Sequence, residues 1–127
     1  MKQKGQALII LIVVIAISLV VLSGVILFAI GQAKISARSK LASQVYYAAE
    51  TGAEYALMKI MRDPTSCSVS DSLNLDSTVI TISYNQSGPD CIITSEANKN
   101  NIVKKIQVQA YYDANQMFNY SNWSQIP

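Results

Sequence analysis

The chain has 127 residues, half of them hydrophobic, and a formal net charge of +2 at pH 7. This length allows one small folded domain rather than two. Because there is no histidine and there are only two cysteines, the composition excludes Ser-His-Asp catalysis, His-ligated zinc and Cys₄ zinc sites. The glycine motifs of nucleotide-binding loops are absent as well. We therefore expect no enzyme activity, no cofactor and no bound metal.

Charge divides the chain into two regions. Residues 1–62 carry seven basic and two acidic side chains, a net charge of +5, whereas residues 63–127 carry three basic and six acidic ones, a net charge of −3. Neither region resembles the basic groove of a nucleic-acid-binding protein, so no nucleic-acid partner is predicted. The basic residues of the first region flank an apolar segment, where anionic lipid headgroups would lie.

The apolar segment is long enough to cross a membrane. No residue from Gly5 to Ala33 is charged, and 21 of the 24 residues from Ala7 to Ile30 are apolar. About 20 such residues span the bilayer core as a helix, which is the one single-segment structure that satisfies its own backbone there. The segment is longer than the roughly 7–15 apolar residues of a secretory signal. We therefore predict a retained transmembrane half-helix over residues 6–33, with a cleaved signal as the alternative.

The same helix is expected to continue through residues 34–62, because no proline precedes Pro64. Apolar and small residues recur there at intervals of three and four, which is typical of an amphipathic helix. They are Leu41, Val45, Ala48, Ala49, Gly52, Ala53, Ala56, Leu57 and Ile60. Asp63-Pro64 is a stop signal, since the residue before a proline is disfavoured in a helix. We predict one continuous helix from about Gln6 to Arg62.

Small residues mark two candidate packing sites on this helix. Ala49, Gly52 and Ala53 would let a sheet or another helix approach closely. Gly24 and Gly31 interrupt the apolar half, where each glycine costs about 1 kcal/mol relative to alanine. These two glycines are either ordinary membrane-helix residues or points at which the helix unwinds after it leaves lipid.

Residues 63–127 predict a small antiparallel sheet domain. Residues 65–77 are rich in Ser, Asp and Asn and predict a loop, and polar clusters at 85–90 and 98–101 predict turns. The β-branched segments between and after these predict three strands. The strands cover residues 78–84, 91–96 and 102–112. Because such a sheet is too small to be stable alone, we expect an α+β fold in which the long N-terminal helix packs on a three-stranded antiparallel sheet.

The C-terminal tail is rich in large apolar side chains. They are Met117, Phe118, Tyr120, Trp123 and Ile126. These side chains either fasten the tail back onto the domain or contact a neighbouring molecule, and we favour the first arrangement.

The two cysteines, Cys67 and Cys91, lie in this polar region. An even pair in a small domain is typical of a disulfide formed outside the cytoplasm. The bridge would close a loop of about 25 residues, worth roughly 3–4 kcal/mol in the chain-entropy model. Two reduced, buried thiols are the alternative.

Lys and Arg counts around the span weakly favour a cytoplasmic C-terminus, but the cysteines favour a C-terminus outside the cytoplasm. We therefore expect a single-pass protein of the cytoplasmic membrane with its C-terminal domain outside.

Two segments of the helix resemble a known family. Residues 4–10, KGQALII, are similar to the leader junction of type IV pilins and type II secretion pseudopilins. Residues 46–57, YYAAETGAEYAL, resemble the YAAEAG.E.AL segment of minor pilin-like proteins of the PilX type. The resemblance covers residues 2–62, and the sheet is similar only in architecture.

The resemblance implies a processed filament subunit. Prepilin peptidase would cut between Gly5 and Gln6 and remove residues 1–5 as a leader peptide. The mature chain would leave the membrane lipid at an inner-membrane assembly platform and join other pilin or pseudopilin subunits, in an extracellular pilus or a periplasmic pseudopilus. Most pilins have a glutamate where Ile10 stands, and its absence implies a minor or tip position. Gln6 replaces the usual Phe or Met, which leaves N-methylation open.

Two other classes of function compete with this reading. A single-span, extracytoplasmic binding or adhesion protein that never assembles would use the same span, but it would keep residues 1–5. An enzyme is a more distant alternative, in which loop carboxylates form a calcium site or an acid pair. The candidate carboxylates are Asp71, Asp76, Asp90 and Asp113, which we interpret as solvated loop residues.

Overall fold

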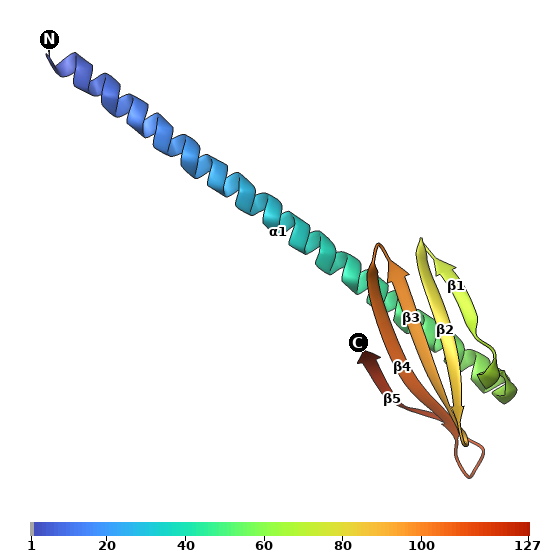
Figure 1. Cartoon of the computed structure of the whole chain (residues 1–127). Helices are drawn as coiled ribbons and strands as arrows, with labels where there is room; N and C mark the ends of the chain where they lie inside the picture. The colour runs from blue at the N-terminus through green and yellow to red at the C-terminus, as the bar shows by residue number, and fades with distance from the viewer. Residues whose placement is uncertain (1) are drawn as a thin grey trace. The chain divides into compact units, whose positions relative to one another are not determined.

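The computed structural model describes the backbone of residues 2–127 and the side chains of residues 5–127. The chain forms one long helix, α1 (Lys2–Arg62), a short 3₁₀ helix, η1 (Pro64–Ser68), and a five-stranded sheet (Figure 1). The strands are β1 (Asp71–Leu75), β2 (Thr78–Ser87), β3 (Asp90–Lys99), β4 (Ile102–Tyr112) and β5 (Phe118–Ile126). They lie in chain order, and each is antiparallel to its neighbours. The α+β class is confirmed.

The chain divides into two units, Met1–Ser39 and Lys40–Pro127. In the first unit every described side chain from Gly5 to Ser39 is exposed, and the helix there is long and apolar enough to cross a membrane. Its two serines, Ser18 and Ser23, donate hydrogen bonds to the backbone carbonyls four residues earlier, each at 2.8 Å. These hydroxyls are therefore satisfied without water, as a helix in lipid requires.

The prediction of three strands is wrong, because the sheet has two more, one at each edge. β1 lies in the segment predicted as a loop, and β5 contains most of the tail. Each edge strand pairs on one side only, and neither contains a fully buried side chain. β5 also has an irregularity in its pairing with β4, opposite Gln107 and Gln109, which hides the strand alternation in its sequence.

The turns between β1 and β4 are shorter than the polar clusters indicate. β2 and β3 continue through most of residues 85–90, so the predicted turn there reduces to Gly88 and Pro89. Asp76-Ser77 and Asn100-Asn101 close the other two hairpins, and all four residues have positive φ. Positive φ at both central residues is the requirement of a type I′ turn, whose twist matches that of the flanking strands.

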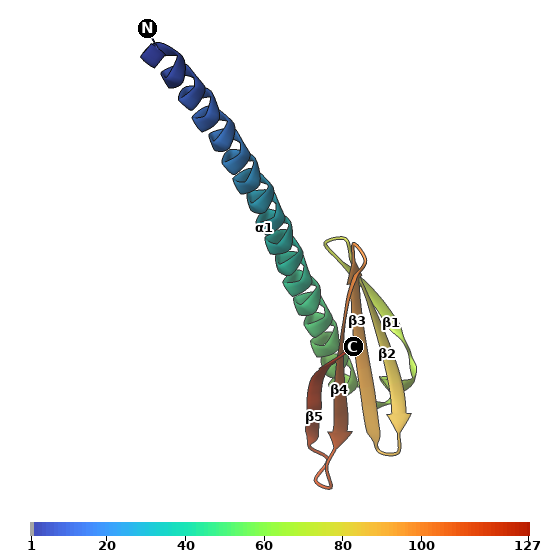
Figure 2. The same ribbon diagram turned by 60° about the vertical axis from the view of Figure 1, so that its left-hand side comes forward.

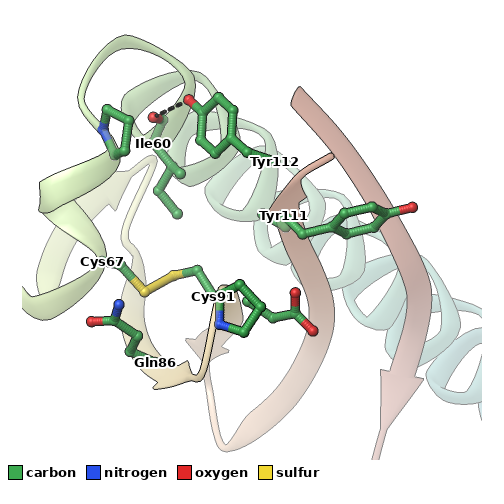
Figure 3. A pocket seen from close by; sticks show the side chains of 10 residues that line it. Ile60, Cys67, Gln86, Cys91, Tyr111 and Tyr112 are labelled. Carbon is green, nitrogen blue, oxygen red and sulfur yellow. Dashed lines mark hydrogen bonds between the residues drawn. A yellow bond between two sulfur atoms is a disulfide. The ribbon is translucent and has the colours of Figure 1, made fainter. Parts of the chain in front are cut away.

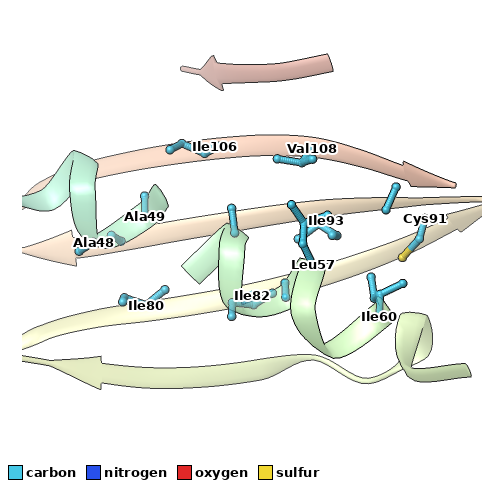
Figure 4. Packing of buried hydrophobic residues seen from close by; sticks show 14 of the residues in the cluster. Ala48, Ala49, Leu57, Ile60, Ile80, Ile82, Cys91, Ile93, Ile106 and Val108 are labelled. Atoms are coloured by element: carbon cyan, nitrogen blue, oxygen red, sulfur yellow. The ribbon is translucent and has the colours of Figure 1, made fainter. Parts of the chain in front are cut away.

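Residues 40–62 of α1 lie over one face of the sheet, and no described helix covers the other face (Figure 2). Side chains alternate accordingly along β2, where Thr78, Ile80 and Ile82 are buried and the residues between them are exposed. Most of the buried cluster is drawn in Figure 4. It contains Val45, Ala48, Ala49, Ala53, Ala56, Leu57, Ile60, Cys67, Ile80, Ile82, Cys91, Ile93, Ala97, Ile106, Val108 and Ala110. The predicted cover of the sheet by the helix's Ala and Gly residues is confirmed.

Candidate functional site

The predicted leader junction lies in the first turns of α1. Gly5 and Gln6 are both exposed, and a Cβ added to Gly5 would meet no atom within 4 Å. Met1 and the side chains of residues 2–4, which belong to the predicted leader, lie outside the described residues.

The apolar half of α1 exposes a continuous apolar surface. Its large apolar side chains from Leu8 to Ile35 are between 49% and 73% exposed. Gly24 and Gly31 lie on the same stretch, and a Cβ at either position would meet no atom within 4 Å. Neither glycine has a packing role within the described chain, so both leave room for a molecule outside it.

The second predicted packing site joins helix to sheet. Ala49 and Ala53 are fully buried, and Gly52 lies between them against Ile80 and Ser95. A Cβ at Gly52 would lie 2.4 Å from Ser95 Oγ and 2.6 Å from Ile80 Cγ2, closer than such atoms pack. Ser95 Oγ is buried without a hydrogen-bond partner, so it serves here as a small side chain. Glycine and serine together set the distance between α1 and β3.

Cys67 and Cys91 form the predicted disulfide, which joins η1 to β3 (Figure 3). Beside it lies a hollow of about 140 Å³, whose wall includes Ile60 and Tyr112. Tyr112 donates a hydrogen bond of 3.2 Å from its hydroxyl to the Ile60 carbonyl, near the C-terminus of α1. The hollow is smaller than the roughly 300–1,000 Å³ of small-molecule sites. The disulfide and this hydrogen bond hold the end of the helix against the sheet.

A polar cluster fastens strand β1 to the helix. Lys59 donates a hydrogen bond to the Asp71 carboxylate, and Tyr84 donates a longer one of 3.4 Å to the same oxygen. The Lys59 ammonium lies 6.0 Å from the centre of the Tyr84 ring. Partial burial and the Asp71 charge raise the pKa of Tyr84 to about 12. Sequence patterns did not reveal this cluster, because its members come from three separate elements.

The four aspartates considered as an acid pair or calcium site are not gathered into one group. Asp71 pairs with Lys59, and Asp76 pairs with Lys99. Asp90 accepts a hydrogen bond from a side chain and Asp113 accepts bonds from backbone amides, so each has its own local partner. Among the residues that the structure describes, no three His, Cys, Asp or Glu side chains are placed to hold a metal ion.

The helix face that points away from the sheet is exposed and mixed in character. Tyr47 is 64% exposed and Met58 is 58% exposed, and Glu54 lies between them on the same face. Among the described side chains, neither Glu50 nor Glu54 makes an ion pair.

Comparisons of the chain with protein-family models, with characterised proteins and with solved structures find no match. The interpretation of the surfaces therefore rests on their geometry and chemistry. The exposed apolar half of α1 suits lipid or other apolar helices, and the sheet packs against the other half of α1.

Proposed function

We propose that this chain is a structural subunit of a filament like the type IV pilus or the type II secretion pseudopilus. The observation that carries the proposal is the change of surroundings along one unbroken helix. From Leu8 to Ile35 the large apolar side chains of α1 are exposed, whereas Val45 to Ile60 supply the helix side of a domain core. Exposed apolar surface of this extent must be covered, by lipid first and then by neighbouring helices.

Processing at the leader is part of the proposal. Prepilin peptidase cuts between Gly5 and Gln6, and removal of Lys2 and Lys4 weakens the attraction of the N-terminus for anionic lipid. A glycine before the cut suits a protease that must approach the backbone closely, because a Cβ would obstruct it. The assembly platform and its energy source are separate proteins, and this chain contributes no catalysis.

The position in the filament follows from Ile10. A glutamate at this place would offer a carboxylate to the amino terminus of a neighbour, and an isoleucine offers none. No residue from Gly5 to Ala33 is charged, so no neighbouring side chain of this segment offers a carboxylate in place of Ile10. We therefore propose a minor or tip position, with the C-terminal domain outside the cytoplasm, where the Cys67–Cys91 disulfide can form.

Intact-mass measurement of the full chain purified from membranes tests the proposal. We expect the mass of residues 6–127 for the wild type and of residues 1–127 for Gly5→Ala. Gly24→Ala is the matched control, since a Cβ meets no atom within 4 Å at either glycine. It should be processed normally. Normal processing of Gly5→Ala would contradict the proposed cleavage site.

A permanently anchored binding or adhesion protein is the second candidate. The same exposed apolar helix favours it, because one span is sufficient for anchoring. An uncut wild-type chain that stays in the membrane would support this candidate against the filament subunit.

A further inference from the structure

We propose that a hollow between α1 and the edge strand β5 binds a quaternary ammonium group, the cationic end of a choline-like molecule. Phe118, Tyr120 and Trp123 supply aromatic side chains to this aromatic hollow, and Glu54 supplies a negative charge. All four residues belong to the unit Lys40–Pro127. The site therefore depends neither on cleavage of the leader nor on assembly of a filament.

The aromatic hollow has the size of a small-molecule site. Its volume is about 390 Å³, within the roughly 300–1,000 Å³ that is usual for such sites. The helix contributes Leu57, Met58 and Met61 to the wall opposite the rings. Met58 is 58% exposed, Met61 is 56% exposed and Tyr120 is 59% exposed, so no described part of the chain covers the opening. An unbranched thioether side chain adapts its shape readily to a ligand.

An irregularity in β5 places two of the rings side by side. Tyr120 and Trp123 are three residues apart, a spacing that points side chains to opposite faces of a regular strand. The register with β4 shifts between Gln107 and Gln109, and Asn122, which lies in the shifted part of β5, has a φ of 54°. Both rings therefore line the same hollow, with their centres 6.1 Å apart and their planes at 67°. Bulges that redirect a side chain in this way are frequent beside functional sites.

The chemistry of the wall selects a cation that has no N–H groups. Aromatic faces attract cations that lie within about 6 Å of the ring centre. Glu54 is exposed and makes no ion pair with a described side chain, so its carboxylate is available to a ligand. A primary ammonium would give up water for a wall with few acceptors, because it has three N–H donors. A quaternary ammonium has none, and it loses no hydrogen bond when it enters.

The neighbouring basic residues of α1 do not occupy this site. Lys59 and Arg62 line a different hollow, which shares only Met58 with the aromatic hollow. Lys59 already donates to the Asp71 carboxylate. Within the described chain, no Lys or Arg side chain lines the aromatic hollow, so Glu54 keeps its charge for a ligand.

Titration of the full chain with choline tests the site. Trp123 is the single tryptophan, so its fluorescence reports binding at the wall itself. The chain is reconstituted in phosphatidylglycerol vesicles, which carry no quaternary ammonium, and sodium chloride holds the ionic strength constant. We expect a saturable change with choline and about fivefold weaker binding of 3,3-dimethylbutan-1-ol, its uncharged isostere. Equal affinities for the two compounds would overturn the recognition of a cation.

Substitutions then separate the contributions of the ring and the charge. Tyr120→Leu removes a largely exposed ring and should weaken choline binding about fivefold. Glu54→Gln should weaken it about two- to fivefold and leave the binding of the isostere unchanged. Tyr47→Leu is the matched control, because Tyr47 is 64% exposed but does not line the hollow, and it should bind choline as the wild type does. Unchanged choline binding in Tyr120→Leu and Glu54→Gln would overturn the site.

A quaternary ammonium can reach the hollow from solution or as a lipid headgroup. Phosphatidylcholine vesicles added in place of choline distinguish the two sources. A response to choline assigns a soluble ligand, and a response to the vesicles alone assigns a headgroup. A wild-type chain that responds to neither would refute the site and leave the filament proposal standing, since that proposal is tested by the mass of the mature chain.

Discussion

Gly52→Ala tests whether the closest approach between α1 and the sheet determines the stability of the domain. Alanine favours the helix by about 1 kcal/mol over glycine. The new Cβ, however, would lie 2.4 Å from Ser95 Oγ and 2.6 Å from Ile80 Cγ2, and overpacking of a filled core costs roughly 1–3 kcal/mol. With two such contacts at once we expect the upper end of that range, and therefore a net loss of about 1–2 kcal/mol.

Unfolding of the full chain in detergent micelles measures this loss. Trp123 is the single tryptophan and packs against the core, so its fluorescence reports the domain. The expected shift of Tm is about 4–8 °C per kcal/mol for a domain of this size. Ser95→Ala removes the nearest clashing atom, so the double variant should lose less than the sum of the single variants. A Gly52→Ala chain as stable as the wild type would refute the reasoning.

Two further predictions concern the other contacts that hold the domain together. Replacing Cys67 and Cys91 by serine should lower the free energy of unfolding by about 3–4 kcal/mol, because the bridge closes a loop between residues 24 positions apart. An unchanged urea midpoint would show that the bridge does not stabilise the fold. The raised pKa of Tyr84, about 12 against an ordinary 10.0, means that the folded state holds its proton more tightly. Stability should therefore fall as the pH rises from 10 to 12. Tyr84→Phe should flatten that fall, and an equally steep loss in the variant would contradict the assignment.

The sequence predicts the helix and the central strands well because their patterns are strong. α1 ends at the predicted Arg62, where Asp63-Pro64 interrupts the helix, although it begins at Lys2 rather than near Gln6. β4 has the predicted bounds, since Ile106, Val108 and Ala110 alternate cleanly on its buried face. The small residues Ala49, Gly52 and Ala53 correctly indicate that the sheet lies close to α1, because short side chains on one helix face let another element pack near its backbone.

The edges of the sheet and the polar cluster could not be predicted in the same way. β1 is as polar as a loop, and the large apolar side chains of β5 do not recur at every second residue. Neither strand contains a fully buried side chain, so neither shows the clear alternation of a central strand. The tail does pack back onto the domain, but as a paired strand, because Phe118 and Trp123 reach the core from β5. Contacts such as Lys59 with Asp71 depend on register between elements, which no local pattern specifies.

Electron microscopy with an antibody against residues 65–127 tests the central claim, that the exposed apolar half of α1 leaves the bilayer to become part of a filament. Wild-type cells should show label on filaments, along their length or at their ends, and Gly5→Ala cells should show it on membranes alone. Label confined to membranes in wild-type cells, on a chain of mature mass, would contradict the account.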